Sequence, residues 1–252
     1  MFVYGKSDVG RKRSVNQDNF AVMEFDARCG YAVICDGMGG HNGGNIASET
    51  AVNVISEQMS ELYDDSVRQR NVAAYLSEAI RKANRAVFAL SLRAPELKGM
   101  GSTVVCAFVM DDSLYVAHVG DSRIYLYDRQ GDRLQQITKD HSVVQQMLDS
   151  GQISVNEAEK YPYRHVITRA LGIDHDVEVE TRVLPFDIGR DVVLLCSDGF
   201  SNMVPDSEKV LLLRQDNYRL ACDRMIAQAN RNGGADNITV AVLCGDADNG
   251  KR

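Results

Sequence analysis

The 252-residue sequence contains no apolar run of 18 residues and no leader of the kind that directs secretion. A membrane-spanning helix would need such a run, and a secreted protein would begin with such a leader. Internal repeats and low-complexity segments are also absent, and none of the four prolines lies in a flexible linker. We therefore expect a soluble, cytoplasmic protein without a membrane partner, built as one domain over residues 1–246 with a short tail at 247–252.

The sequence also has fewer basic residues than acidic ones. The chain has 28 Lys and Arg residues against 35 Asp and Glu residues, which gives a formal net charge of −7. Because nucleic-acid backbones are held mainly by Lys and Arg, a broad nucleic-acid surface is excluded. The acidity can serve solubility alone, or several aspartates can be metal ligands whose charge the formal count ignores.

The six cysteines form no Cys-x-x-Cys pair. This absence excludes the common zinc and thioredoxin-like signatures. Four of the six, Cys35, Cys106, Cys196 and Cys244, lie inside apolar runs, so we expect them to be buried and reduced. Reduced cysteines are typical of a cytosolic protein.

Hydrophobic periodicity predicts the main elements. Apolar residues recur with helical spacing over residues 47–62 and 72–90, and two further helices are expected at 207–213 and 218–230. The strand-like runs are 18–25, 31–35, 103–110, 114–119, 123–127, 134–137, 177–184, 192–196 and 238–244. Short turns separate the four runs between 103 and 137, which favours antiparallel hairpins over parallel crossovers.

Residues 142–164 differ from this pattern. They contain a short helical stretch, a break at Gly151 and an acidic second segment. We interpret them as an excursion from the sheet, a flap over about residues 142–165. Paired helices and runs of adjacent strands predict an α+β fold, with sheets packed together and helices outside.

Five aspartates stand where an apolar run meets a turn residue. They are Asp18, Asp36, Asp121, Asp198 and Asp236. Each one alone is ordinary turn chemistry, because Asp-Gly and Asp-Asn pairs are frequent in turns. Five in one sheet protein indicate more, since strand ends can converge and gathered carboxylates repel unless they are protonated or bind a cation. Ligation by oxygen alone suits Mg²⁺, Mn²⁺ or Ca²⁺ rather than zinc.

A glycine-rich run over residues 37–44 follows Asp36 and invites a nucleotide-binding interpretation. The spacing excludes it, because the dinucleotide pattern starting at Gly37 needs glycine at position 42, which is Asn42, and no Gly-Lys-Ser/Thr loop occurs. The run can be a tight strand-to-helix turn, or a backbone that approaches ions closely, with the Gly37 carbonyl free to ligate one. We favour the second interpretation because Asp36 adjoins it.

Taken together, these stretches resemble the bacterial branch of the metal-dependent protein phosphatase family, the 2C-type serine/threonine phosphatases. The resemblance covers nearly the whole chain, and its pieces follow one another in family order. They are Arg13-Ser14-Val15-Asn16-Gln17-Asp18, Cys35-Asp36-Gly37-Met38-Gly39-Gly40-His41, Gly101-Ser102-Thr103, Val119-Gly120-Asp121-Ser122-Arg123, Thr138-Lys139-Asp140-His141-Ser142, Thr168-Arg169-Ala170-Leu171-Gly172, Cys196-Ser197-Asp198-Gly199 and Asp236-Asn237-Ile238-Thr239.

The resemblance implies a four-layer α-β-β-α sandwich, in which two antiparallel sheets are flanked by helix pairs. It also implies two or three Mn²⁺ or Mg²⁺ ions per chain. Asp36 would bridge two metals, the Gly37 carbonyl would bind one of them, and Asp198 and Asp236 would bind the other. The implied activity is hydrolysis of phosphoserine and phosphothreonine in proteins by a metal-activated water, with no covalent enzyme intermediate.

Further roles follow from the same resemblance. Asp121 would join Asp198 in a third metal site, and Asp18 would hold a metal-bound water. Arg13 would clamp the substrate phosphate, since a guanidinium offers a planar fork to phosphate oxygens. Considered without the family, Arg13 is better interpreted as one surface charge in the basic stretch 11–13.

The general acid is the open question. Many eukaryotic relatives carry a histidine directly after the Asp-Gly pair, where this chain has Met38, which cannot donate a proton. His41 and a water on the third metal near Asp121 are the two candidates, and we favour the water. His165, at the end of the flap, would face the substrate, although His41 and His165 could each be ordinary exposed or structural histidines.

We expect a monomer whose partners are phosphorylated proteins, opposed by a serine/threonine protein kinase. Two alternatives remain open at this point. The chain could be a catalytically weak family member that binds phosphoproteins, although a family member that had lost activity would have no reason to keep all five aspartates. It could also be a metallohydrolase of small phosphate esters.

Overall fold

The computed structural model describes residues 1–63, 71–158, 161–163, 165–215 and 217–245. The strands are β1 (Phe2–Asp8), β2 (Asp18–Asp26), β3 (Cys29–Met38), β4 (Gly101–Ser102), β5 (Val104–Met110), β6 (Ser113–Val119), β7 (Arg123–Asp128), β8 (Arg133–Gln136), β9 (Glu180–Pro185), β10 (Asp191–Cys196) and β11 (Ile238–Cys244). The helices are α1 (Gly40–Leu62), α3 (Val72–Ser91), the 3₁₀ turn η1 (Pro95–Leu97), α4 (Val143–Asp149), α5 (Val155–Ala158), α6 (Asp198–Ser201), α7 (Asp206–Leu213) and α8 (Tyr218–Arg231).

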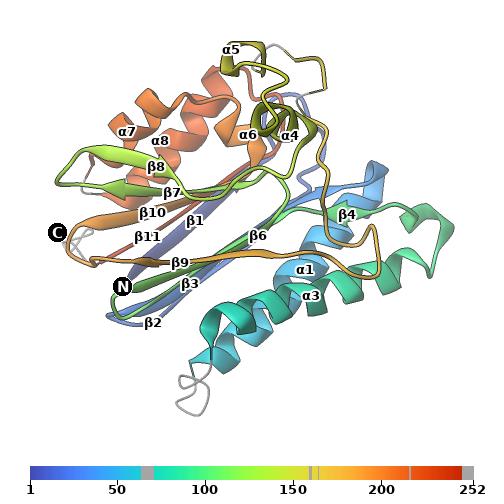
Figure 1. The fold of residues 1–252 in the computed structure, drawn as a ribbon, viewed down its shortest axis with the longest axis horizontal. Helices are drawn as coiled ribbons and strands as arrows, with labels where there is room; N and C mark the ends of the chain where they lie inside the picture. Colours follow the sequence, from blue (N-terminus) through green and yellow to red (C-terminus); the bar gives the residue numbers. More distant parts are fainter. Residues whose placement is uncertain (64–70, 159–160, 164, 216, 246–252) are drawn as a thin grey trace.

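Two antiparallel sheets form the centre of the fold. One has the strand order β1-β11-β10-β7-β8, and the other has the order β2-β3-β5-β6-β9, with β4 paired to β3. Helices α1 and α3 cover the outer face of the second sheet, and α7 and α8 cover the outer face of the first (Figure 1). The predicted four-layer α-β-β-α sandwich is therefore confirmed.

Strand alternation explains why the layers are buried on both sides. In β3, Ala32 and Ile34 pack between the sheets against residues such as Val193 of β10. Their neighbours Tyr31 and Val33 point to the opposite face and pack against α1 and α3. Successive side chains of a strand lie on opposite faces, so a strand covered by a sheet on one face and helices on the other must be apolar throughout. This is why β3, β5, β10 and β11 each contain a continuous apolar run of five or more residues.

The expected elements agree with the structure, with boundary shifts of a few residues. The main omission is β1, which was not predicted as a strand. Most of its residues are only partly buried, and it lies at a sheet edge, where its one partner is β11. The register pairs Phe2 with Cys244, so β1 owes its conformation to a segment at the other end of the chain. Strand β9 begins at Glu180 rather than at residue 177.

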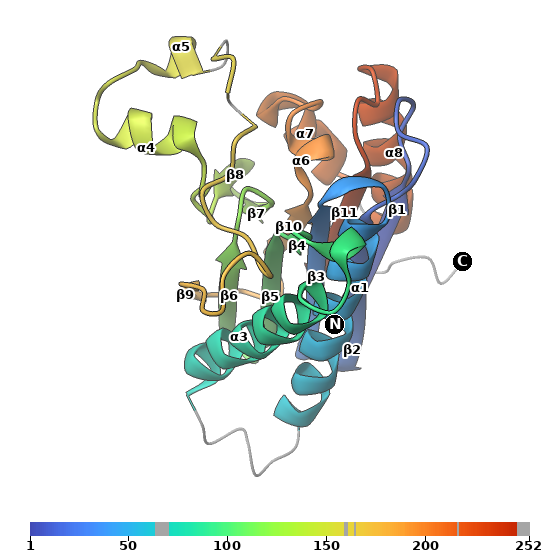
Figure 2. The same cartoon turned by 90° about the vertical axis from the view of Figure 1, so that its right-hand side faces the viewer.

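The segment between β8 and β9 leaves the sandwich. Its described part contains α4 and α5, which stand away from both sheets (Figure 2). Ser142 caps α4 by accepting a hydrogen bond from the Gln145 amide at 3.2 Å, and Gly151 turns the chain with a φ of 67°. Within the described residues, no helix has the length and apolar character that a membrane span requires.

Candidate metal centre

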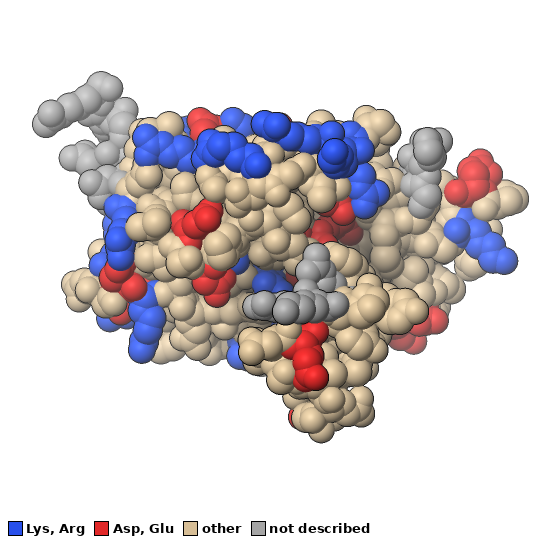
Figure 3. All heavy atoms as spheres, turned by 90° about the horizontal axis from the view of Figure 1, so that it is seen from above, with Lys and Arg blue, Asp and Glu red and all other residues tan. Residues whose placement is uncertain are grey.

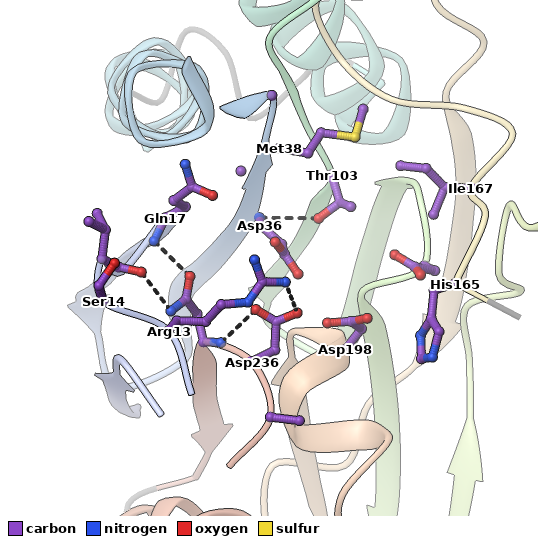
Figure 4. Close-up of a pocket in the computed structure, with 16 residues that line it drawn as sticks. Arg13, Ser14, Gln17, Asp36, Met38, Thr103, His165, Ile167, Asp198 and Asp236 are labelled. Carbon is purple, nitrogen blue, oxygen red and sulfur yellow. Dashed lines mark hydrogen bonds and ion pairs between the residues drawn. The ribbon is translucent and has the colours of Figure 1, made fainter. Parts of the chain in front are cut away.

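A cavity of about 750 Å³ opens where the two sheets meet, and residues from both sheets line it. Its carboxylates belong to Asp36, Asp121, Asp198 and Asp236. Arg13, Gly37, Met38 and His165 also line it, together with the polar side chains of Ser14, Gln17, Thr103 and Asn237. Figure 4 shows the acidic side chains converging on the centre of this space.

Strand pairing explains the convergence. Asp18 begins β2 and stands directly opposite Asp36 near the end of β3. In the other sheet, Asp198 follows β10, and Asp236 lies two residues before β11, the antiparallel neighbour of β10. Asp121 follows β6 in the turn that carries the chain from the second sheet to β7 of the first. Turn residues scattered along the chain thus meet at one end of the sandwich.

The gathered carboxylates resist ionisation. Burial raises the pKa of Asp36 well above its usual range, and the charges of the surrounding aspartates raise it further. Burial likewise raises the pKa of Asp121 to about 8, with Asp198 and Asp140 adding to the effect. The pKa of Asp198 is raised by burial and by Asp236. A carboxylate cluster of this kind is stabilised by protons or by cations.

Asp18 lies behind this cluster and is fully enclosed. Its Oδ2 accepts hydrogen bonds from Ser197 Oγ at 2.8 Å and Thr239 Oγ1 at 2.6 Å. Its Oδ1 is buried and has no hydrogen-bond partner within the described chain. Burial raises the pKa of Asp18 to about 7, against the lowering effect of those two hydroxyl groups. An orphaned buried acceptor beside four carboxylates fits a water held on a cation.

The donor set fits a hard cation in other respects. Every candidate side-chain ligand is a carboxylate, which suits Mg²⁺ or Mn²⁺. Gly37 is essential to the shape of the site, because a β-carbon there would lie 2.1 Å from the Gly44 carbonyl oxygen and 2.7 Å from the Gln17 carbonyl oxygen. The glycine run therefore serves close backbone packing, as well as turning the chain from β3 into α1.

Arg13 lies at the rim of the cavity. Its Nη2 is 2.8 Å from Asp236 Oδ2, and 53 % of its side chain is exposed. The loop that carries it is fastened by Asn237, whose Nδ2 donates to the carbonyl oxygens of Val9 and Val15, while its Oδ1 accepts from the Gln17 amide. No sequence pattern predicted this role for Asn237, because its partners are more than 200 positions away in the chain.

Of the two candidate histidines, His165 and His41, the structure describes the side chain of His165 only. His165 lines the cavity on the side of Asp198, where its charge would lower the pKa of that carboxyl group. His41 belongs to the first turn of α1, but its side chain lies outside the described part of the structure. Met38 lines the cavity at the position after the Asp-Gly pair.

Residues 138–142 have a role that the sequence did not reveal. The backbone N–H of Gly120 donates to His141 Nδ1 at 3.1 Å, and the His141 N–H donates to the Gly120 carbonyl at 2.9 Å. Asp140 binds Arg123 through Nε at 3.0 Å and Nη2 at 2.8 Å. These contacts hold the chain on both sides of Asp121.

A second group of potential metal ligands is formed by His118, His141 and Glu180. Its hydrogen bonds argue against a metal there. Because His141 Nδ1 accepts from Gly120, the neutral ring carries its proton on Nε2, which faces Glu180 Oε2 at 3.5 Å. His118 Nε2 donates to the Lys139 carbonyl at 2.8 Å. Burial lowers the pKa of both histidines, so the stacked rings are neutral packing groups near pH 7.

Figure 3 shows the molecule from above the view of Figure 1. Lys and Arg side chains form a band along one edge of this face, and Asp and Glu side chains are recessed near its middle. At the left and right ends of this face, acidic and basic side chains lie next to each other.

Several known proteins are similar to this chain in sequence and fold. The sequence profile of the protein phosphatase 2C family matches residues 5–237. The serine/threonine phosphatase stp of Listeria innocua is 38% identical over 239 residues, which are 94% of this chain and 93% of the relative. The crystal structure of the Mycobacterium tuberculosis serine/threonine phosphatase PstP/Ppp superimposes with a TM-score of 0.85 at 36% identity, covering 96% of this chain and 97% of that one. The catalytic domain of PstP in complex with 2 manganese ions gives a TM-score of 0.82 at 35% identity, with 96% of both chains covered.

A two-sheet sandwich with a carboxylate cluster where the sheets meet defines a class of metal-dependent phosphatase. The chain belongs to the protein phosphatase 2C family. It is a serine/threonine phosphatase of the bacterial type.

Proposed function

We propose that this chain hydrolyses phosphoserine and phosphothreonine in proteins with two or three Mn²⁺ or Mg²⁺ ions held by the pocket carboxylates. One observation carries the proposal. Four carboxylates from both sheets converge on one cavity, where burial and neighbouring charges raise the pKa of Asp36, Asp121 and Asp198. Beside them lies a buried carboxylate oxygen of Asp18 that has no partner in the described chain.

The positions of these groups support the following ligand assignment. Asp36 and the Gly37 carbonyl would bind metal from β3, while Asp198 and Asp236 would bind metal from the other sheet. Asp121 would serve a third ion together with Asp198. Asp18 would act through a water, because it lies behind the other carboxylates and its Oδ1 is a free acceptor.

When bound, such ions lower the pKa of a water and offset the negative charge of a phosphate ester. The chain's own groups then bind and orient the substrate. Arg13 presents a guanidinium at the rim, where it can form paired hydrogen bonds with phosphate oxygens. His165 lies on the opposite side of the cavity, within reach of a substrate held by Arg13. No side chain of the site is proposed as a covalent nucleophile.

The decisive test compares substrates and metals. Purified protein should release phosphate from phosphothreonine and phosphoserine peptides only when Mn²⁺ or Mg²⁺ is present, and it should be inactive with EDTA. Nucleotides and sugar phosphates, assayed at the same concentration, should be poor substrates. If small esters are cleaved as well as peptides, the protein specificity is wrong. If phosphopeptides bind but are not hydrolysed, the chain is a phosphoprotein-binding member instead.

We also infer the domain organisation, the cellular location and the partners of the chain. Residues 1–246 would form one catalytic domain with a flap at about 142–165; the tail at 247–252 lies outside the described residues. Cys35, Cys106, Cys196 and Cys222 are buried free thiols, which supports action in the reducing cytoplasm. A serine/threonine protein kinase would supply the phosphorylated substrates, and the protein would act as a monomer.

A further inference from the structure

A second hollow, which we call the side hollow, lies next to the catalytic cavity and has a volume of about 460 Å³. Met38 and Ile167 line both spaces, so the two lie side by side. In Figure 4, Ile167 lies across the catalytic cavity from Arg13 and Ser14. A polypeptide whose phosphate reaches Arg13 could therefore extend past Ile167 into the side hollow.

The floor of the side hollow is apolar and exposed. Val166 is 44% exposed and Ile173 is 43% exposed, so both aliphatic side chains are accessible to a ligand in the hollow. A β-carbon on Gly101 would lie 2.9 Å from Met38 Cε and 3.0 Å from Ile173 Cδ1, so the tips of these two side chains meet over Gly101. An aliphatic side chain of a ligand would find apolar contact here.

The rim of the side hollow is acidic. Asp174, Asp176 and Glu178 line it, and Arg169 is the cation among the lining residues. Arg169 is already paired with Glu178, with Nη2 2.7 Å from Oε2, and His175 Nδ1 lies 3.1 Å from Asp176 Oδ2. Within the described chain, Asp174 makes no ion pair. The rim therefore keeps a net negative charge, which complements a basic side chain.

The wall that carries these residues is held in place. Ser102 and Leu171 exchange backbone hydrogen bonds of 3.1 and 2.8 Å. Asn84 of α3, which is buried, accepts from the Gly172 amide at 2.8 Å and donates to the carbonyl oxygens of Asp174 and His175 at 3.1 and 2.9 Å. The side hollow is thus a preformed surface, and little ordering is needed when a ligand binds.

We propose that the side hollow binds substrate residues next to the phosphorylated side chain and selects an aliphatic residue together with a basic one on one side of it. The inference rests on the proposed function, because the ligand is the protein substrate itself. The aliphatic group packs on Met38, Val166 and Ile173, and the basic group reaches Asp174 and Asp176.

The test uses matched phosphothreonine peptides. One carries Leu and Lys on the amino side of phosphothreonine, a second carries them on the carboxyl side, and a third has Ser and Glu in their place. We expect one of the first two to exceed the third in kcat/KM by about threefold to tenfold, as one or two exposed charge pairs allow. The double variant Asp174→Asn/Asp176→Asn should remove most of the Lys preference, and Ile173→Ser should remove the Leu preference.

Controls separate this proposal from the activity itself. p-Nitrophenyl phosphate has no flanking residues, so its turnover should stay within about twofold in all variants, which also verifies folding. The variant Asp111→Asn/Asp112→Asn makes the same charge change at the β5–β6 turn, far along the sheet from the site, and should keep the preference.

Equal kcat/KM for all three peptides would overturn the side-hollow proposal and leave the phosphatase proposal standing. Loss of all phosphopeptide hydrolysis in the unmodified protein would overturn both. If Ile173→Ser instead abolished self-association measured by light scattering, the hollow would bind a second copy and the proposal would be wrong.

Discussion

Asp18 and Asp36 stand directly opposite each other on β2 and β3, although like charges in paired positions destabilise a sheet. The pairing persists because both side chains lie at the strand ends, beside the cavity that also holds Asp121, Asp198 and Asp236. The carboxylates therefore repel one another at this end of the sandwich, and bound protons or cations reduce that repulsion.

Metal ions should therefore stabilise the fold more strongly as the pH rises. The folded chain holds protons on Asp18 and Asp121 up to a pKa of about 7 and about 8. In the unfolded chain these groups ionise near pH 4. Between pH 6.5 and 8 the folded chain in EDTA thus binds more protons than the unfolded chain, and its stability falls as the pH rises. Saturating Mn²⁺ should offset this loss.

The measurement is the melting temperature with and without Mn²⁺ at pH 6.5, 7.25 and 8. A hundredfold excess over Kd contributes about 2.7 kcal/mol, or roughly 5–10 °C for a chain of this size. The Mn²⁺-induced shift should be largest at pH 8. The variant Asp112→Asn, which changes an exposed carboxylate far from the site, should show the same trend. A shift that is equal at all three pH values would contradict the electrostatic account.

The aspartates should contribute unequally to turnover. Asp36→Asn and Asp198→Asn should each remove nearly all activity, because each would contact the two-metal centre. Asp121→Asn should retain two bound ions and lose only part of the turnover. Calorimetric titration with Mn²⁺ counts the ions, and phosphopeptide assays give kcat. If Asp121→Asn lost ions as fully as Asp36→Asn, its assignment to a third site would be wrong.

Arg13→Ala should act on phosphate recognition. It should raise KM for phosphopeptides by about tenfold or more, since the side chain offers a charge-assisted fork to the phosphate, and leave Mn²⁺ affinity unchanged. Arg11→Ala is the matched control, because Arg11 is an exposed arginine of the same loop and does not line the cavity. An unchanged kcat/KM in Arg13→Ala would reduce Arg13 to a surface charge.

The proton donor can be identified by changing the leaving group. A serine alkoxide needs protonation, whereas p-nitrophenolate needs little. We expect His41→Ala to slow both substrates by the same modest factor and Asp121→Asn to slow the phosphoserine peptide more, which would locate the donor on the Asp121 side of the cavity. A loss of about 10²-fold confined to the peptide in His41→Ala would instead make His41 the acid.

The local pattern of apolar and turn residues in the sequence determined most of the helices and strands of this protein. The helical spacing of apolar residues in α1 and α3 and the continuous apolar runs of β3, β5, β10 and β11 identify those elements, because each run reflects burial on known faces. The five aspartates at strand ends were visible for a similar reason. Turn residues next to buried strands are local features, and their repetition suggested one oxygen-rich site.

Other features depend on partners far away in the chain. Strand β1 exists because β11 supplies its hydrogen bonds, and Asn237 fastens the Arg13 loop through contacts across more than 200 positions. His141 holds Gly120 next to Asp121 by a pair of hydrogen bonds whose geometry no sequence motif encodes.

The charge state of the site and the shape of the side hollow were decided only by tertiary structure. An aspartate's pKa depends on how much solvent surrounds it and on which other charges lie within a few ångströms. The acidic rim and apolar floor of the side hollow likewise arise only where β3, β4 and residues 166–178 come together. Sequence specifies which groups are available, but burial and distance, which set their energies, come from the packing of the two sheets.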